Sequence, residues 1–335
     1  MKQKKAITWI LVAALVILAA WQIWLRFPNE TYVVQQDSRL LMDTVITITV
    51  VAKEGVAQET LDRGFEELRR VDTLTNRYIG DSELSKLNKE RTLAVSKDLL
   101  HLIEISEEYR HKSGNAYDAR LGRLVDLWGF GSNRRSVPSE VQIAKVLPSG
   151  DIEINNSTVT LPADVILDLG AVAKGYAIEQ ARNVMKRTAK AGLIVGGGSS
   201  VACWGEHPEK RPWRIGLRHP RDTNKLLGVI ELEDGWSLGT SGDYERYFIQ
   251  DSKRYHHILD GRTGYPGQDV YATSVLTKSS TLADILSTLL FVLGPEDGKA
   301  FLNENGFDEI GVIWVMAPGE IVTYEKGVKL PELSF

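Results

Sequence analysis

The sequence contains very little cysteine and no block of charge of one sign. Cys203 is the only cysteine among 335 residues, which excludes an intramolecular disulfide framework and a thiolate-rich zinc site. No catalytic-cysteine motif surrounds Cys203, so we interpret it as a small buried apolar residue. The formal net charge is only −4. The composition therefore offers no electrostatic basis for binding nucleic acid, and we expect no nucleic-acid partner.

The remaining composition is typical of a globular protein, with 43% hydrophobic and 25% charged residues. Residues 6–25 form one long uncharged run, preceded by Lys2, Lys4 and Lys5. As a helix, 20 residues rise about 30 Å, roughly one hydrocarbon core. Cleaved signal peptides usually have a shorter apolar stretch. We therefore favour an uncleaved membrane helix over a signal cleaved near residues 18–20.

The lysines before this apolar run predict a cytoplasmic N-terminus, with the rest of the chain on the extracytoplasmic side of the cell membrane. We expect residues 1–27 to be the membrane anchor or signal, residues 28–39 to be a polar linker, and residues 40–328 to be the folded catalytic domain.

Periodic patterns predict both strands and helices in that domain. Helices and strands are mixed without a regular βαβ alternation, so we expect an α+β fold. The predicted elements are a strand at 40–51, helices at 57–74, 97–112 and 281–293, mostly strands from residue 191, and strands at 310–315 and 321–324.

Two segments place polar groups where a phosphate or a metal ion could bind. Asp168 to Tyr176 (DLGAVAKGY) passes from a strand into a helix, and a helix start with a nearby Lys174 is a natural phosphate seat. A tight turn with a solvated lysine is an equal alternative. Asp284 and Thr288 are four residues apart on a helix, which suits a hard cation such as Mg²⁺. The alternative is an acid in the first helical turn, favoured by the helix dipole.

A histidine pair offers a candidate general base. His256 and His257 lie near the end of a predicted strand, followed by Asp260, which could orient one of them. Neighbouring strand residues face opposite sides, so only one can point into a given cleft. A surface or hydrogen-bonded core histidine is the alternative. The glycines at 196–198 lack the G-x-G-x-x-G spacing of a Rossmann site, and Ser241 lacks a nucleophile elbow.

Eight segments carry a combined signal: LMDTVITITV, RYIGDSELSKLN, GNAYDARLGRLVDLWGFG, ILDLGAVAKGYAIE, PWRIGLRHP, TSGDYERYF, YHHILDGRTGYP and TLADILSTLLFVLG. Together they resemble the ApbE family of FAD:protein FMN transferases. They occur in the family's order and cover residues 40 to 325. The chain departs from the family's usual residues at Asp43, Ala119, Ser199 and Gly261.

The resemblance implies an ApbE-like fold of mixed sheets and packed helices that binds FAD as substrate, with Mg²⁺ at its pyrophosphate. The residues that correspond to the family's FAD contacts are Met42, Tyr78, Ala116, Tyr117, Asp118, Asp168, Lys174 and Ile258. The implied metal ligands are the carbonyl of Ala171 and the side chains of Asp284 and Thr288. His257 corresponds to the histidine proposed to assist transfer, with Lys174 and Asp284 also at the reaction centre.

The implied reaction moves FMN from FAD to a threonine of a target flavoprotein and releases AMP. The family's targets carry a D/S-G-A-S/T-like motif and are subunits of membrane redox complexes. One alternative is an Mg²⁺-dependent FAD pyrophosphatase, in which water replaces the threonine; the family associates that activity with an asparagine in the region of Tyr78. A non-catalytic flavin-binding protein is an alternative of another class.

Overall fold

An antiparallel sheet of eight strands forms the centre of the protein. The computed structural model describes residues 31–132 and 134–335. The strand order is β1-β2-β6-β7-β10-β13-β14-β15, and each neighbouring pair is antiparallel. These strands are β1 (Tyr32–Leu41), β2 (Thr44–Lys53), β6 (Ala189–Gly196), β7 (Ser200–Trp204), β10 (Ser237–Gly242), β13 (Val270–Thr277), β14 (Ile310–Met316) and β15 (Ile321–Lys326).

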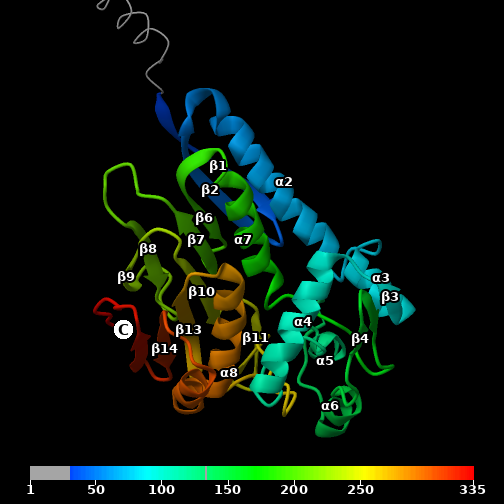
Figure 1. Ribbon diagram of the computed structural model, residues 1–335. Coiled ribbons are helices and arrows are strands. Elements are labelled where there is room, and N and C mark those ends of the chain that lie inside the picture. Colours follow the sequence, from blue (N-terminus) through cyan, green and yellow to red (C-terminus); the bar gives the residue numbers. More distant parts are fainter. Residues whose placement is uncertain (1–30, 133) are drawn as a thin grey trace, which may run out of the picture.

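Three helices cover one face of this sheet (Figure 1): α2 (Ala57–Thr75), which follows a 3-10 turn at Glu54–Val56, α7 (Ala173–Met185) and α8 (Ser280–Asn305). Leu61, Phe65 and Leu68 of α2 are fully buried, because their spacing places them on one side of the helix. The main hydrophobic core lies between these helices and the sheet.

The other face of the sheet is partly covered by a hairpin of β8 (Trp213–Arg218) and β9 (Leu226–Leu232). Alternation along the strands separates the two faces, so that Ala202 belongs to the main core and its neighbour Cys203 to the second one. Burial raises the pKa of the Cys203 thiol to about 12, which agrees with its interpretation as a buried, unreactive residue.

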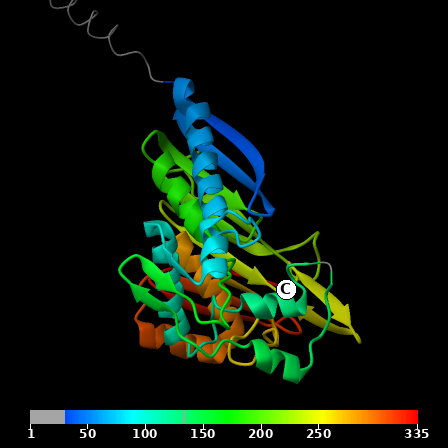
Figure 2. The same ribbon diagram turned by 90° about the vertical axis from the view of Figure 1, so that its right-hand side faces the viewer.

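A smaller lobe gathers at the C-terminal end of α2 (Figures 1 and 2). Its helices are α3 (Glu83–Glu90), α4 (Lys97–Lys112), α5 (Gly122–Trp128) and α6 (Glu140–Val146), beside the small sheet of β3 (Thr92–Ala94), β5 (Thr158–Thr160) and β4 (Glu153–Asn155). A separate hairpin, β11 (Tyr247–Gln250) and β12 (Lys253–His256), packs its aromatic side chains against Trp128 and Phe130 of this lobe.

The mixed α and β content confirms the α+β prediction, but several element boundaries differ. Residues 40–51 do not form one strand, because a two-residue turn at Met42 and Asp43 divides them between β1 and β2. Both turn residues have positive φ, 52° and 58°, as a tight hairpin turn requires. Met-Asp lacks the usual Asn-Gly signature, so the pattern hid the turn. The predicted linker at 28–39 is wrong from Tyr32 onward, where β1 begins.

Helix α8 is also longer than predicted. Gly294 leaves helical geometry (φ 71°, ψ −179°) directly after the predicted helix 281–293, but the helix resumes at Pro295 and continues to Asn305. Proline is well suited to the first turn of a helix. The predicted membrane span at residues 6–25 lies outside the described residues. Within the residues described, no helix has the length and apolar character needed to cross a membrane.

Candidate active site

A cavity of about 510 Å³ lies among the start of α7, the middle of α8 and the smaller lobe. It brings together nearly all the residues singled out from the sequence. Those that line it are Met42, Tyr78, Tyr117, Asp118, Asp168, Ala171, Lys174, His257, Ile258, Asp284 and Thr288. Ala116 is the exception: it is fully buried, and its carbonyl accepts a hydrogen bond from the backbone of Gly261 at 3.3 Å.

One end of the cavity is formed where α7 meets α8. Gly175 allows this contact, because a Cβ at that position would lie 2.2 Å from the carbonyl oxygen of Ser280 and 2.7 Å from Cβ of Asp284. The Ser280 hydroxyl donates to the carbonyl of Gly175 at 2.8 Å. The close approach places the first turn of α7, with its outward N–H groups, next to a carboxylate of α8.

Asp284 is a buried carboxylate, 7% exposed. Its Oδ2 accepts from the backbone N–H of Gly175 and its Oδ1 from the Ser200 hydroxyl, both at 2.8 Å. Burial raises the pKa of Asp284, and the Lys174 ammonium and the two hydrogen bonds oppose that rise. Among the described residues no lysine, arginine or histidine forms an ion pair with Asp284. Each carboxylate oxygen therefore accepts one hydrogen bond and retains capacity for a further partner, and Asp284 lines the cavity.

Two further oxygens lie at this end of the cavity. The Thr288 hydroxyl is 3.1 Å from that of Ser241. The Ala171 carbonyl accepts no hydrogen bond from the described part of the chain, because the N–H of Gly175, its usual helical partner, donates to Asp284 instead. Oxygen donors of this kind are the ligands that Mg²⁺ prefers. The residues described contain no cluster of three or more His, Cys, Asp or Glu side chains suited to a metal ion.

Lys174 lies in the first turn of α7 and lines the cavity. Its ammonium forms no hydrogen bond or ion pair with the residues that the structure describes, and it acts on Asp284 and His257 only through space. A cation without a partner at a helix start attracts an anion such as phosphate. The alternative of a solvated lysine on a tight turn does not account for its position inside the cavity.

His257 is the member of the histidine pair that points into the cavity. Its Nδ1 lies 3.3 Å from the carbonyl oxygen of Arg246. A carbonyl cannot donate, so Nδ1 must carry the proton and Nε2 keeps its lone pair. Burial, together with the positive charge of Arg246, lowers the pKa of His257 to about 3. The imidazole is therefore neutral at physiological pH.

The neighbouring polar residues have other partners. His256 turns away and is satisfied on both sides: its Nε2 donates to the carbonyl of Gly267 at 2.9 Å and its Nδ1 accepts from the N–H of Ile258. The expectation that Asp260 orients the histidine is wrong. Asp260 binds the backbone and guanidinium of Arg262, because the turn after Asp260 folds that arginine back onto it.

Asp168 and Tyr78 share a third residue that the sequence analysis missed. The Nε of Arg77 donates to Asp168 at 2.9 Å, and its Nη2 donates to the Tyr78 hydroxyl at 2.8 Å. The guanidinium also covers the Tyr78 ring, 4.5 Å from its centroid, and pairs with Asp126. These contacts raise the pKa of Arg77 against the cost of burial. Tyr78 is thereby fixed at the rim of the cavity, where the residue is 55% exposed.

Ser200 and Arg246 were also missed. Ser200 lies two residues after the glycines at 196–198, which form a turn: Gly197 and Gly198 have φ of 60° and 74°. The turn leads into β7, whose first residue, Ser200, is hydrogen-bonded to Asp284. The exposed side chain of Arg246 lines the cavity beside His257. No local pattern linked Arg246 to His257, 11 residues away, or Ser200 to Asp284, 84 residues away.

The fold and the cavity define the class of protein. An α+β domain that combines a helix start, an unpaired lysine, a buried carboxylate and a neutral histidine in one cavity is suited to chemistry on a phosphorylated substrate. The protein is an enzyme of that kind.

Comparison with known proteins identifies the family. The chain belongs to the ApbE family, whose model matches residues 42–313, and is a flavin transferase. It is 30% identical over 296 residues to an FAD:protein FMN transferase of Klebsiella pneumoniae, covering 85% of this chain and 90% of that protein. It is 32% identical over 281 residues to one of Vibrio cholerae, covering 79% and 83%.

Solved structures agree with this assignment. The ApbE protein of Thermotoga maritima superposes with a TM-score of 0.79 at 29% identity, covering 88% of this chain and 97% of that one. The flavin transferase ApbE of Vibrio cholerae gives a TM-score of 0.77 at 27% identity, covering 88% and 98%. The ApbE-like fold expected from the sequence is therefore confirmed.

Proposed function

We propose that the protein moves the FMN part of FAD to a threonine hydroxyl of an acceptor flavoprotein and releases AMP. The observation that carries this proposal is that three groups of a flavin transferase chain line one cavity. Lys174, which has no partner among the described residues, lies within electrostatic reach of the Asp284 carboxylate, and His257 lies near Lys174. The cavity thus offers a place for a diphosphate and, beside it, a neutral base for a hydroxyl.

The bond changes balance without a further reactant. The threonine Oγ forms a bond to the FMN phosphorus, and the bond from that phosphorus to the bridging oxygen breaks. The bridging oxygen leaves with AMP. Nε2 of His257 accepts the hydroxyl proton, while the Arg246 carbonyl holds Nδ1–H and so fixes the tautomer. Lys174 stabilises negative charge on the diphosphate.

Mg²⁺ fits one end of the cavity. Within residues 31–132 and 134–335 the carbonyl of Ala171 has no hydrogen-bond partner, and Asp284 and Thr288 add a carboxylate and a hydroxyl on one face of α8. A buried carboxylate with no cation partner is costly unless a positive charge binds beside it. We propose these three groups as the ligands. Bound there, Mg²⁺ supplies neutralisation of the pyrophosphate charge.

The remaining FAD contacts follow from the cavity wall. We propose that Met42, Tyr78, Tyr117, Asp118, Asp168 and Ile258 hold the dinucleotide, with Ala116 supporting them from behind. Met42 sits in the strained turn between β1 and β2, and such strain often occurs at binding sites.

For the acceptor and the location we propose the following. The acceptor is a membrane redox-complex subunit with a D/S-G-A-S/T-like motif, residues 6–25 anchor the chain in the cell membrane, and the catalytic domain lies outside. The sequence pattern at the N-terminus supports this placement. Strand β1 begins at Tyr32, which supports a catalytic unit that starts before residue 40.

Incubation of the protein with FAD, Mg²⁺ and an acceptor fragment tests the proposal. We expect a fluorescent band on a denaturing gel, a mass increase equal to one FMN, and one AMP per labelled acceptor. A threonine-to-valine acceptor is the matched control and should stay unlabelled. Accumulation of free FMN and AMP with no labelling would instead establish the pyrophosphatase. Intact FAD after binding would contradict both activities.

A further inference from the structure

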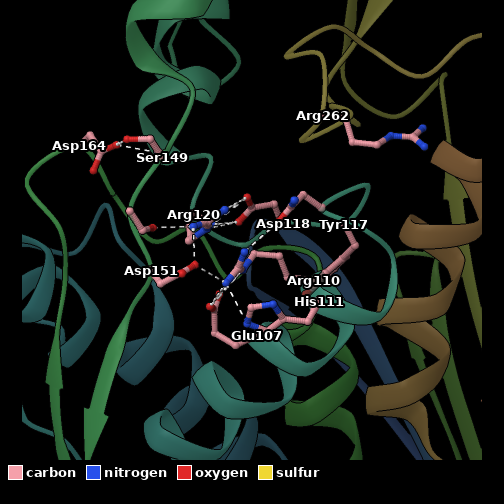
Figure 3. Close-up of polar contacts among 12 residues, drawn as sticks. Glu107, Arg110, His111, Tyr117, Asp118, Arg120, Ser149, Asp151, Asp164 and Arg262 are labelled. Atoms are coloured by element: carbon pink, nitrogen blue, oxygen red, sulfur yellow. Dashed lines mark hydrogen bonds and ion pairs between the residues drawn. The ribbon is translucent and has the colours of Figure 1, made fainter.

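Next to the cavity lies a cluster of charged side chains, one of which, Asp118, is a proposed FAD contact (Figure 3). It centres on Arg110 at the end of α4 and Arg120 before α5, each only 4% exposed. Arginine is rarely buried to this extent unless its donors are satisfied. The cluster therefore has a structural or functional purpose.

Arg120 forms a bidentate ion pair with the carboxylate of Asp118. Its Nε and Nη2 donate to the two oxygens at 3.0 and 2.8 Å, and its backbone N–H donates to Oδ1 at 2.8 Å. The remaining Nη1 donates to the carbonyl of Gly150 at 2.6 Å. A two-pronged contact of this kind fixes orientation as well as charge. Asp118 lines the cavity although its side chain is only 1% exposed.

Arg110 holds the same loop from the other end. Its Nη1 donates to the side chain of Asn115 at 2.8 Å, and its Nε and Nη2 bind Glu107. Asp151 links the two arginines, 2.9 Å from Nη2 of Arg110 and 3.7 Å from Nη1 of Arg120, as Figure 3 shows. Residues 115–120 are therefore held at both ends by guanidinium groups that share a carboxylate.

The chain between these two contacts forms a wall of the cavity. Tyr117 and Asp118 both line it, and the backbone of Gly261 packs closely against them: a Cβ there would lie 2.3 Å from the carbonyl oxygen of Asn115. Such tight packing leaves little room for the loop to rearrange. If Asp118 lost its partner, a buried uncompensated charge would remain, and the carboxylate would turn toward water in the cavity.

We propose that Arg120, supported by Arg110 and Asp151, is a positioning residue that holds Tyr117 and Asp118 in the conformation that binds the flavin dinucleotide. This inference rests on the proposed function, because it takes FAD as the ligand of that wall. It predicts that removal of the guanidinium affects FAD affinity beyond any loss of stability.

The test measures the Kd for FAD by titration, and Tm, on the full-length chain. We expect Arg120→Met to weaken FAD binding about tenfold and Arg120→Lys, which keeps charge but loses the fork, to be intermediate. Arg182→Met is the matched control. Arg182 is similarly buried and donates to Gly235, Ser237 and Lys278, none of which lines the cavity. It should lower Tm and leave the Kd within about twofold.

A double-mutant cycle separates positioning from general stability. In an Asp118→Asn background, Arg120→Met should weaken FAD binding by less than about twofold further, because the two residues act as a pair. Fully additive effects, or a wild-type Kd in Arg120→Met with a Tm loss like that of Arg182→Met, would overturn the inference. If Arg120→Met does not fold, Arg120→Lys and Asp151→Asn are judged by the same criteria. Failure of the wild-type chain to bind FAD would instead overturn the proposed function.

Discussion

The two walls of the cavity differ in whether their carboxylates are paired with a cationic side chain. On the wall formed by the smaller lobe, Asp118 and Asp168 each pair with an arginine, Arg120 and Arg77. At the α7–α8 junction, the Asp284 carboxylate accepts, from the residues described, hydrogen bonds from a backbone N–H and a serine hydroxyl and from no cationic side chain. A paired carboxylate is neutralised and fixed in orientation, whereas an unneutralised buried one keeps its capacity for a cation. The first wall is thus suited to positioning and the second to chemistry.

The largest expected effect is that of a substitution at Asp284. We expect Asp284→Asn to reduce flavin transfer roughly a thousandfold, since it removes the carboxylate from the three proposed Mg²⁺ ligands. The same change removes a buried charge that has no cationic partner among the described residues, so Tm should stay the same or rise. Product formation, measured with FAD and Mg²⁺, checks the first part, and a thermal melt, measured without Mg²⁺, checks the second.

Asp168→Asn is the matched change on the other wall. It leaves the largely buried Arg77 with one carboxylate fewer, so Tm should fall while Mg²⁺ dependence is retained. A loss of Tm in Asp284→Asn equal to that in Asp168→Asn would show that the two walls do not differ in the way proposed.

The second effect concerns the base. We expect His257→Asn to lower the rate of transfer about a hundredfold with little change in the affinity for FAD, as loss of general base catalysis predicts. Single-turnover labelling of the acceptor measures the rate. His256→Asn is the control, because both nitrogens of His256 are used within the fold. That variant should lose Tm while the folded fraction retains transfer. An unchanged rate in His257→Asn would exclude the assigned role.

A smaller effect concerns Ser200, which donates to Asp284 at the α7–α8 junction. Ser200→Ala removes one of the two donors to Asp284, so the pKa of that carboxyl should rise further and its orientation should loosen. We expect transfer to fall about tenfold, with partial recovery at raised Mg²⁺ concentration. Ser287→Ala removes a neighbouring buried hydroxyl that donates to the backbone of Asp284 and not to its carboxylate. It is the matched control and should show no dependence of this kind.

The residues at the α7–α8 junction were easier to predict from the sequence than those on the wall of the smaller lobe, for a physical reason. Asp284 and Thr288 share a helix face, and Lys174 follows a strand-to-helix transition, so local periodicity indicates their arrangement. Ala171 and the FAD contacts came from the family resemblance and not from a pattern. Arg77, Arg110 and Arg120 act through loops and long-range pairs, such as Arg77 with Asp168, 91 residues apart. No local pattern encodes such contacts.

The same distinction applies to the fold. Helix α4 was predicted with the bounds that the structure shows, because Ser96 caps its start and the basic residues Arg110 to Lys112 end it. The β1–β2 turn was missed because Met42 and Asp43 adopt positive φ without glycine. Tertiary contacts fix that turn: it projects into the cavity, and the N–H of Met42 faces Asp72 of α2 at 3.4 Å.

The smallest effect is a pH dependence of stability that reports the charge around His257. The pKa of His257 is about 3 in the folded chain, below its ordinary value of 6.5. Between these values the unfolded chain binds a proton that the folded chain does not, so the stability contribution is present above pH 6.5 and is lost as pH falls toward 3.

Because the imidazole is partly exposed, we expect a modest effect, with Tm falling by about 2 °C more between pH 7 and pH 5 in the wild-type chain than in His257→Asn. The comparison between the two chains cancels the carboxylates, whose lowered pKa values also cost stability on acidification. Added FAD should shrink the difference, since a diphosphate near the imidazole raises its pKa. A difference that FAD leaves unchanged would place the diphosphate away from His257, and the base would then need to be sought elsewhere in the cavity.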